Sequence, residues 1–202
     1  MLDSWLWELA NQAINRIPDP IDYVEMRRKT FGSDLTMALA RLGHDLDQVP
    51  PEVYATRVIH ELETAAQDYA CFANDLFSYQ KEVQFEGELH NMVLVVEHFL
   101  DVDRWAAADV VARLMADRMR QFEHLAEAGL PALFTEQALP EPAREALTRH
   151  VAQMRDWMSA VLEWHKQTTR YTDSELRRTH HGFTLIPTGL GTAAARIPQL
   201  IS

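Results

Sequence analysis

Apolar residues recur at helical spacing along most of the 202-residue chain, and Pro and Gly divide this pattern into blocks. Val and Ile never run in the strict alternation of a half-buried strand, so the pattern predicts an all-α protein. The predicted helices cover about residues 4–16, 20–31, 33–42, 52–86, 89–100, 104–129 and 141–169. The longest block, 52–86, contains no Pro or Gly and is predicted to be one unbroken helix.

Two helix boundaries carry specific signals. Asp19 precedes Pro20, which places an N-cap side chain before a proline at the first helical position. Gly32 interrupts the pattern before the third helix. The pattern decays after Tyr171, so we expect one domain over residues 1–180 and a loosely ordered tail over residues 181–202.

Composition narrows the class of protein. A content of 47% hydrophobic residues suits one domain with a core, and no apolar run approaches the length of a membrane span. The net charge of -11 argues against a nucleic-acid partner. The N-terminus lacks the features of a signal peptide, and the single cysteine, Cys71, excludes an intramolecular disulfide. We therefore expect a cytoplasmic protein.

Three oxygen-bearing residues follow one face of the longest predicted helix. Asn74, Ser78 and Glu82 are spaced at i, i+4 and i+8 and offer a carbonyl, a hydroxyl and a carboxylate. Such ligands suit Mg²⁺, which often completes its shell with substrate phosphate. The spacing alone is typical of a solvated polar face, but its place in an apolar stretch favours a metal site. Asp75 faces away from this metal stripe and is predicted to pair with a nearby base.

The residues Asn74-Asp-Leu-Phe-Ser-Tyr-Gln-Lys-Glu82 resemble the second metal-binding motif of bacterial class I terpene synthases, Asn-Asp-x-x-Ser-x-x-Lys-Glu. Arg28, one turn before Gly32, is similar to the diphosphate-sensing arginine of that family. Arg170-Tyr171 is similar to the Arg-Tyr pair near the end of its domain. The resemblance implies the all-α class I terpenoid synthase bundle, in its C-terminal portion.

The resemblance also implies roles for these residues. Asn74, Ser78 and Glu82 would bind Mg²⁺. Hydrogen bonds to the diphosphate of a prenyl substrate would come from Arg28, Lys81, Arg170 and Tyr171. Arg28 and the Arg170-Tyr171 pair are accordingly expected at the mouth of one central cavity, which the metal stripe also faces. Cations placed there would stabilise the charge that grows on the departing diphosphate.

Aromatic residues recur every seven positions near the C-terminal end of the pattern, at Trp157, Trp164 and Tyr171. Trp164, the nearer to Arg170-Tyr171, is the better candidate for stabilising a carbocation, whereas core packing is at least as well supported for Trp157. Phe77, next to the metal stripe, fits a cavity wall and core packing equally well.

Residues 77–91 and the following Val93-Leu-Val-Val96 most resemble the germacradienol/geosmin synthases. Arg118-Met-Arg-Gln-Phe122 and Asp156-Trp-Met158 agree with this subfamily. The resemblance implies a magnesium-dependent lyase that ionises and cyclises farnesyl diphosphate to germacradienol, or that converts germacradienol to geosmin. Leu89-His90-Asn91 slightly favours the geosmin-forming domain.

The first metal motif of the family, an aspartate-rich segment on an upstream helix, has no match here, and the helices that precede Trp5 in the family are also absent. We therefore expect an N-terminally truncated chain that is catalytically weak, not very stable and prone to homo-oligomerise. The alternative is a non-catalytic helical remnant that binds diphosphate and Mg²⁺, or packs with a partner. A di-iron bundle is disfavoured, because Glu97-His98 and Glu123-His124 are adjacent pairs and not Glu-x-x-His motifs.

Overall fold

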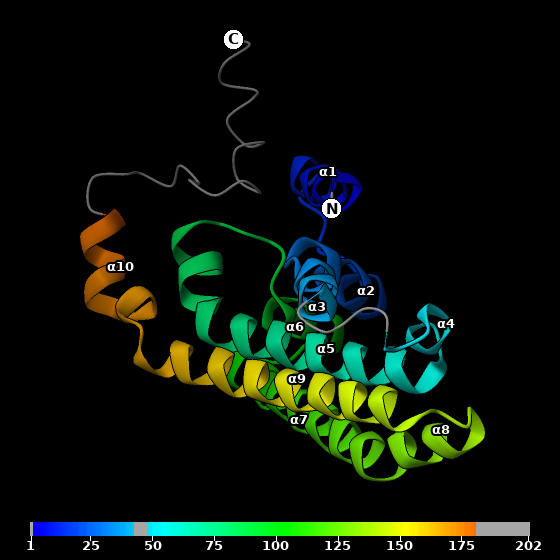
Figure 1. The fold of residues 1–202 in the computed structure, drawn as a ribbon. Helices are drawn as coiled ribbons and strands as arrows, with labels where there is room; N and C mark the ends of the chain where they lie inside the picture. Colours follow the sequence, from blue (N-terminus) through cyan, green and yellow to red (C-terminus); the bar gives the residue numbers. More distant parts are fainter. Residues whose placement is uncertain (1, 43–47, 181–202) are drawn as a thin grey trace.

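The computed structural model describes residues 2–42 and 48–180, and these two stretches consist of helices joined by turns and loops, with no strand (Figure 1). The α-helices are α1 (Leu2–Ala13), α2 (Pro20–Thr30), α3 (Ser33–Leu42), α4 (Pro51–Tyr54), α5 (Arg57–Tyr79), α6 (Met92–Leu100), α7 (Arg104–His124), α8 (Leu130–Glu136), α9 (Glu141–Gln167) and α10 (Asp173–His180). Two π-helical segments, Gln80–Phe85 and Leu125–Gly129, and a 3-10 helix, Thr169–Tyr171, extend or join them. The predicted all-α class is confirmed, and the predicted tail, 181–202, lies outside the described residues.

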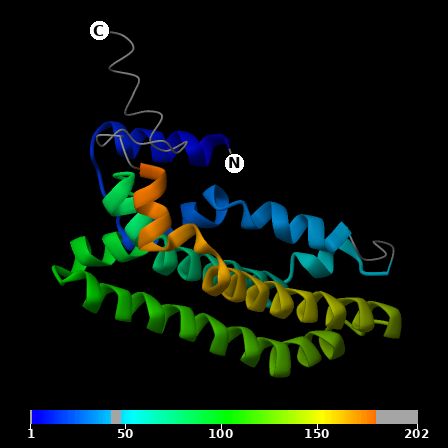
Figure 2. The same cartoon turned by 90° about the vertical axis from the view of Figure 1, so that its left-hand side faces the viewer.

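Helix α5 lies in the middle of the bundle, with α2 and α3 on one side and α7 and α9 on the other (Figures 1 and 2). It packs most extensively against α7 and α9. Small residues on it, Ala66, Ala70 and Ala73, are fully buried and let the neighbouring helices approach closely. A helix buried on all sides is typical of a bundle core. None of the described helices is both long and apolar enough to cross a membrane.

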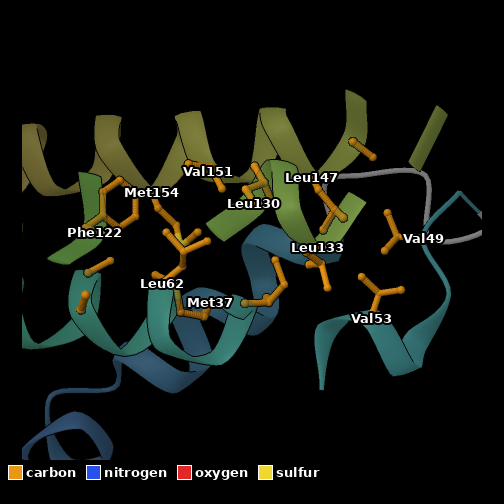
Figure 3. Packing of buried hydrophobic residues seen from close by; sticks show 14 of the residues in the cluster. Met37, Val49, Val53, Leu62, Phe122, Leu130, Leu133, Leu147, Val151 and Met154 are labelled. Carbon is orange, nitrogen blue, oxygen red and sulfur yellow. The ribbon is translucent and has the colours of Figure 1, made fainter. Parts of the chain in front are cut away.

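Two apolar clusters flank α5. The first joins α5 to α8 and α9 and includes Leu62 and Met154 (Figure 3). Trp157 packs partly buried against this cluster, so it is a core aromatic residue. The second cluster lies between α2, α6 and α7 and includes Tyr23 and Val95. Together they hold the helix that carries the predicted metal stripe from both sides.

Three buried carboxylates on α5 also fasten α2 and α3 to it. The pairs are Glu63 with Arg41, Asp68 with Arg28 and Asp75 with Arg27. Each carboxylate residue is at most 6% exposed. Because a buried charge is costly unless it is paired, these contacts determine how α2 and α3 lie on the central helix.

The predicted unbroken helix over 52–86 is wrong at its start. The chain forms the short α4, turns through Ala55 and Thr56, and begins α5 at Arg57. Thr56 has an extended backbone, and its hydroxyl donates to the carbonyl of Val53, so this break needs no Pro or Gly. From Arg57 onward the helix continues to Phe85, but its last six residues are π-helical.

Several other boundaries follow their local signals. Asp19 caps α2 by accepting from the backbone amides of Ile21 and Asp22, as predicted. Gly32 separates α2 from α3 with a positive φ of 80°, which favours glycine. Helices α8 and α10 were not predicted. For α8 the reason is Pro131, which indicated a loop but sits in the first turn of the helix, where proline is tolerated.

Candidate metal- and diphosphate-binding site

Asn74 lies on α5 where α2, α9 and the 3-10 segment meet. Its Oδ1 accepts a hydrogen bond from Arg27 Nη2 at 2.8 Å. Its Nδ2 lies 3.0 Å from His165 Nε2 and donates to the Tyr171 hydroxyl at 3.3 Å. The structure therefore brings a predicted metal ligand into contact with a predicted diphosphate ligand that is 97 residues away in the sequence.

Ser78 and Glu82 follow Asn74 along the same helix, Glu82 within the π-helical segment. The Ser78 residue is 1% exposed, and its hydroxyl makes no hydrogen bond of standard geometry within the described residues. Removal from water raises the pKa of Glu82, whereas Arg27, a hydrogen bond from Asn91 and the nearby Ser78 hydroxyl lower it in part. A buried hydroxyl without such a bond and a carboxylate whose charge is disfavoured are both groups that a bound cation would stabilise.

Asp75 pairs with a base, as predicted, but it does not turn fully away from the metal stripe, because the same nitrogen of Arg27 also contacts Asn74 Oδ1. Its Oδ1 accepts from Arg27 Nη2 at 2.7 Å, and its Oδ2 accepts from the Tyr23 hydroxyl at 2.6 Å and the Met92 amide at 3.0 Å. The residue is fully buried. Asp75 thus joins α2 and α6 to α5 directly behind the site and is positioned as a structural residue.

Arg28 is placed differently from the prediction. Its Nε pairs with Asp68 Oδ1 at 2.6 Å, and Asp68 also pairs with Arg118 at 2.9 Å. The adjacent Arg27 is the arginine that contacts Asn74. Successive residues differ by about 100° around a helix axis, so two neighbouring arginines on α2 reach different parts of α5. The diphosphate-binding role of Arg28 stays a prediction.

The other predicted diphosphate ligands lie at the two ends of the metal stripe, Lys81 next to Glu82 and the Arg170-Tyr171 pair beside Asn74. Lys81 Nζ pairs with Glu86, which directly follows the π-helical segment, at 2.6 Å. Arg170 is exposed, and its guanidinium lies 5.9 Å from the centre of the Tyr171 ring. Burial raises the pKa of the Tyr171 phenol, so its hydroxyl stays protonated at neutral pH.

An open cleft of about 470 Å³ adjoins Asn74. Its lining residues come from α9, α5, the end of α2 and the 3-10 segment: Phe31, Asn74, Ala160, Val161, Trp164, His165, Arg170 and Tyr171. Trp164 is 51% exposed and presents its ring edge-to-face with Tyr171 at 6.1 Å. The predicted partners Asn74, Trp164 and Arg170-Tyr171 thus share one cleft.

The remaining predicted residues lie elsewhere. Ser78, Glu82 and Arg28 are not among the residues that line this cleft, so Asn74 alone of the metal stripe faces it. Phe77 lines a separate cavity of about 310 Å³ between α5, α6 and α7. Its ring also lies 5.4 Å from that of His165, which is an ordinary packing contact.

Three residues at the site were not found from the sequence. Arg27 was not singled out, because the resemblance pointed to the adjacent Arg28. Asn91 donates to Glu82 Oε2 at 3.1 Å and caps α6; its position directly before an apolar run was an available N-cap signal. His165, which contacts Asn74, lies between Trp164 and Arg170-Tyr171, but nothing in its own spacing indicated that contact.

The comparison with protein families agrees with this site. Residues 1–121 match the family described as "Terpene synthase family 2, C-terminal metal binding". This match covers more than half of the chain, and the all-helical bundle fits it. The chain belongs to this terpene synthase family.

Individual relatives are similar over most of the chain. The (-)-delta-cadinene synthase of Streptomyces clavuligerus is 33% identical over 166 residues, which are 82% of this chain and 50% of that protein. Sesquiterpene synthase 1 of Postia placenta is 32% identical over 173 residues, or 84% of this chain and 48% of that protein. The crystal structure of germacradien-4-ol synthase from Streptomyces citricolor matches with a TM-score of 0.66 and 26% identity, covering 76% of this chain and 48% of that one.

The chain therefore spans about half the length of these relatives. The predicted family, a bacterial class I terpene synthase, and its all-α fold are confirmed. The germacradienol/geosmin subfamily stays a prediction.

Proposed function

We propose that this chain is the metal- and diphosphate-binding part of a Mg²⁺-dependent sesquiterpene synthase, a lyase that ionises and cyclises farnesyl diphosphate to a germacradienol- or geosmin-type product. The observation that carries the proposal is the contact of Asn74 with Tyr171 beside a cleft that Trp164 and Arg170 also line. The sesquiterpene synthases among the relatives support the substrate class. Germacradien-4-ol synthase among the solved structures and the resemblance of residues 77–91 support the product class.

The donor set fits a hard cation. Asn74 Oδ1 already accepts from the cationic Arg27, the Ser78 hydroxyl is buried without a standard hydrogen bond, and burial disfavours the charge of Glu82. All three donors are oxygen atoms, which is what Mg²⁺ prefers. When bound there, the metal would supply Lewis-acid neutralisation of the charge on the departing diphosphate.

The chain's own cations would bind the same diphosphate. Arg170 is exposed at the cleft and needs no rearrangement to donate. Lys81 and Arg28 are held by carboxylates, so each would exchange its protein partner for a phosphate oxygen. The apolar wall of the cleft would offer the allylic cation few polar groups to react with, and the face of Trp164 would stabilise its positive charge.

Binding of Mn²⁺ in the presence of pyrophosphate, followed by electron paramagnetic resonance, tests the proposed site. We expect Glu82→Gln to weaken Mn²⁺ binding by at least about 10-fold, because the only carboxylate of the proposed set is lost. Glu61→Gln is the matched control. Glu61 lies on the same helix but pairs with Arg57 at the surface, 3.6 Å away. The Mn²⁺ affinity of Glu61→Gln should therefore equal that of the wild type. Equal affinities for Glu82→Gln and the wild type would refute the metal site.

A second candidate is a non-catalytic remnant that binds diphosphate and metal without turnover. It is favoured by one observation: residues 2–42 and 48–180 contain no group of three or more His, Cys, Asp or Glu side chains arranged to hold a metal ion. Incubation with farnesyl diphosphate and Mg²⁺, followed by gas chromatography, separates the two candidates. Cyclised product supports the synthase, whereas binding without product supports the remnant.

A further inference from the structure

His165 makes specific contacts at the site through both ring nitrogens. It lies in the last turn of α9 and is 5% exposed. Its Nδ1 lies 2.7 Å from the carbonyl oxygen of Val161, and its Nε2 lies 3.0 Å from Asn74 Nδ2. Both nitrogens of the ring are therefore engaged, each with a different kind of group.

These contacts determine the tautomer of His165. A backbone carbonyl can only accept, so Nδ1 carries the proton and donates to Val161. In the neutral ring, Nε2 then presents its lone pair and must accept. Asn74 consequently offers its NH₂ group, and not its carbonyl, to His165.

The contact that Asn74 makes on the other side of its amide requires the same orientation. Arg27 is a donor only, and its Nη2 lies 2.8 Å from Asn74 Oδ1. A reversed amide would place NH₂ against the guanidinium and the carbonyl oxygen against the lone pair of His165. Oδ1 has two lone pairs, so the hydrogen bond from Arg27 leaves one acceptor position for another ligand.

We propose that His165 is a positioning residue for the metal site: it fixes the orientation of the Asn74 amide, so that Oδ1, and not Nδ2, is the atom that the side chain offers to a cation. The inference rests on the proposed function, since it assigns Oδ1 as a metal ligand. Residues that orient a metal ligand typically contribute about 10- to 100-fold to metal affinity.

The ring of His165 is itself held by aromatic neighbours. It stacks on Tyr171 with the ring centres 5.5 Å apart and the planes within 3° of parallel, and Trp164 meets it edge-on at 4.8 Å. If the ring served only to pack, it would need these ring contacts but not the two hydrogen bonds. A phenylalanine at this position would keep the ring contacts and lose the hydrogen bonds, so it separates a packing role from a positioning role.

The first experiment needs no metal. Nitrogen-15 NMR should show that the neutral ring carries its proton on Nδ1 and leaves Nε2 unprotonated, and the side-chain NH₂ protons of Asn74 should exchange slowly with water. In His165→Phe we expect the Asn74 NH₂ protons to exchange faster. The opposite tautomer, with Nε2 protonated, would overturn the inference. An unchanged exchange rate in His165→Phe would overturn it as well.

The second experiment measures Mn²⁺ affinity with pyrophosphate. We expect His165→Phe to weaken binding by about 10-fold or more, and His165→Gln, which can offer an acceptor oxygen, to recover most of that loss. In the Asn74→Asp background the two carboxylate oxygens are equivalent, so the side chain no longer needs to be held in one orientation. His165→Phe should then weaken Mn²⁺ binding little further. An equal loss in both backgrounds would show a packing role and overturn the inference. If the wild type binds no Mn²⁺ at all, the proposed function fails, while the NMR result still decides the orientation of the amide.

Discussion

Adjacent residues at the site have separate tasks, because about 100° of helix rotation separates them. Asn74 reaches α9 through His165, whereas Asp75 reaches α2 and α6 through Arg27 and the backbone of Met92. Arg27 contacts both, so the candidate metal ligand and the buried ion pair share one guanidinium group. We therefore expect a change in the ion pair to shift the position of Asn74.

The ion pair behind the site should be important for stability. We expect Asp75→Ala to lower the free energy of unfolding by about 3–5 kcal/mol, because it leaves the guanidinium of Arg27 buried without a partner. Asp22→Ala is the control, since Asp22 is about half exposed and lies 3.9 Å from Arg16, a geometry worth at most about 1 kcal/mol. Urea denaturation of both variants measures the difference. Equal losses of unfolding free energy in the two variants would show that the buried Asp75 pair stabilises the fold no more than the exposed Asp22 pair does.

Helix spacing was sufficient to predict some of these residues and not others. The shared helix of Asn74, Ser78 and Glu82 follows from i, i+4 geometry on one element, which the sequence contains, whereas their metal-binding role stays a prediction. His165 could not be predicted in this way, because its partner lies 91 residues away and the contact depends on how α9 packs on α5. Which of the two arginines contacts Asn74 could not be predicted for the same reason, since it depends on the rotation of α2.

At the scale of elements, the contacts of α5 set the arrangement of the bundle. Glu63 joins three helices, because it accepts from His150 of α9 at 3.0 Å and from Arg41 of α3. Burial acts to raise the pKa of Glu63, but the hydrogen bonds from His150 and Arg41 outweigh it and the net pKa is lowered.

This shift has a definite sign for stability against pH. The folded pKa of Glu63 lies below its unfolded value of 4.5, so its contacts stabilise the fold fully above that pH, and the contribution is lost as the pH falls through the folded pKa. We expect Glu63→Gln to lower the free energy of unfolding by about 1.5–3 kcal/mol at neutral pH, and by progressively less as the pH falls below 4.5. Urea denaturation across this range, with Glu61→Gln as control, measures it. A cost that stays constant with pH would contradict this assignment.

The elements themselves were predictable where the signal is local. The cap at Asp19 and the break at Gly32 are decided by a few residues, and both were predicted. The break at Thr56 was missed because it has no Pro or Gly and accompanies the burial of Val53 in the first core cluster (Figure 3). The π-helical turn at residues 80–85 was missed as well, since no residue type specifies it.

At the scale of the whole molecule, several apolar side chains are left uncovered. Leu2 and Leu6 lie one turn apart on α1 and are 73% and 63% exposed, and Leu35 and Leu39 on α3 are 50% and 57% exposed. Figures 1 and 2 both show α1 on the outside of the bundle, beyond α2 and α3. Uncovered apolar positions of this kind are typical of surfaces that pack against something else.

We therefore expect the 202-residue chain by itself to associate with other copies at micromolar concentration. Replacing the exposed leucines with glutamate, in the double variant Leu6→Glu/Leu39→Glu, should shift the population toward the monomer, because the association would bury these side chains. Analytical ultracentrifugation measures the shift. The control is Leu147→Ala, which lies fully buried in the core and should lower stability without favouring the monomer. A wild type that sediments as a monomer would contradict the expectation.

The same 202 residues should be weak in catalysis even if they bind metal and diphosphate. Glu82 is the only carboxylate of the proposed ligand set, and the described residues offer no second acidic cluster to hold further ions near it. The charge that grows on a departing diphosphate would then meet fewer fixed cations than the reaction requires. One well-aimed electrostatic contact is worth about 10²–10³ in rate, so the loss of several leaves little turnover. Gas chromatography after incubation with farnesyl diphosphate and Mg²⁺ measures the product. Rapid cyclisation by a monomer would mean that the chain holds its ions through residues other than this stripe.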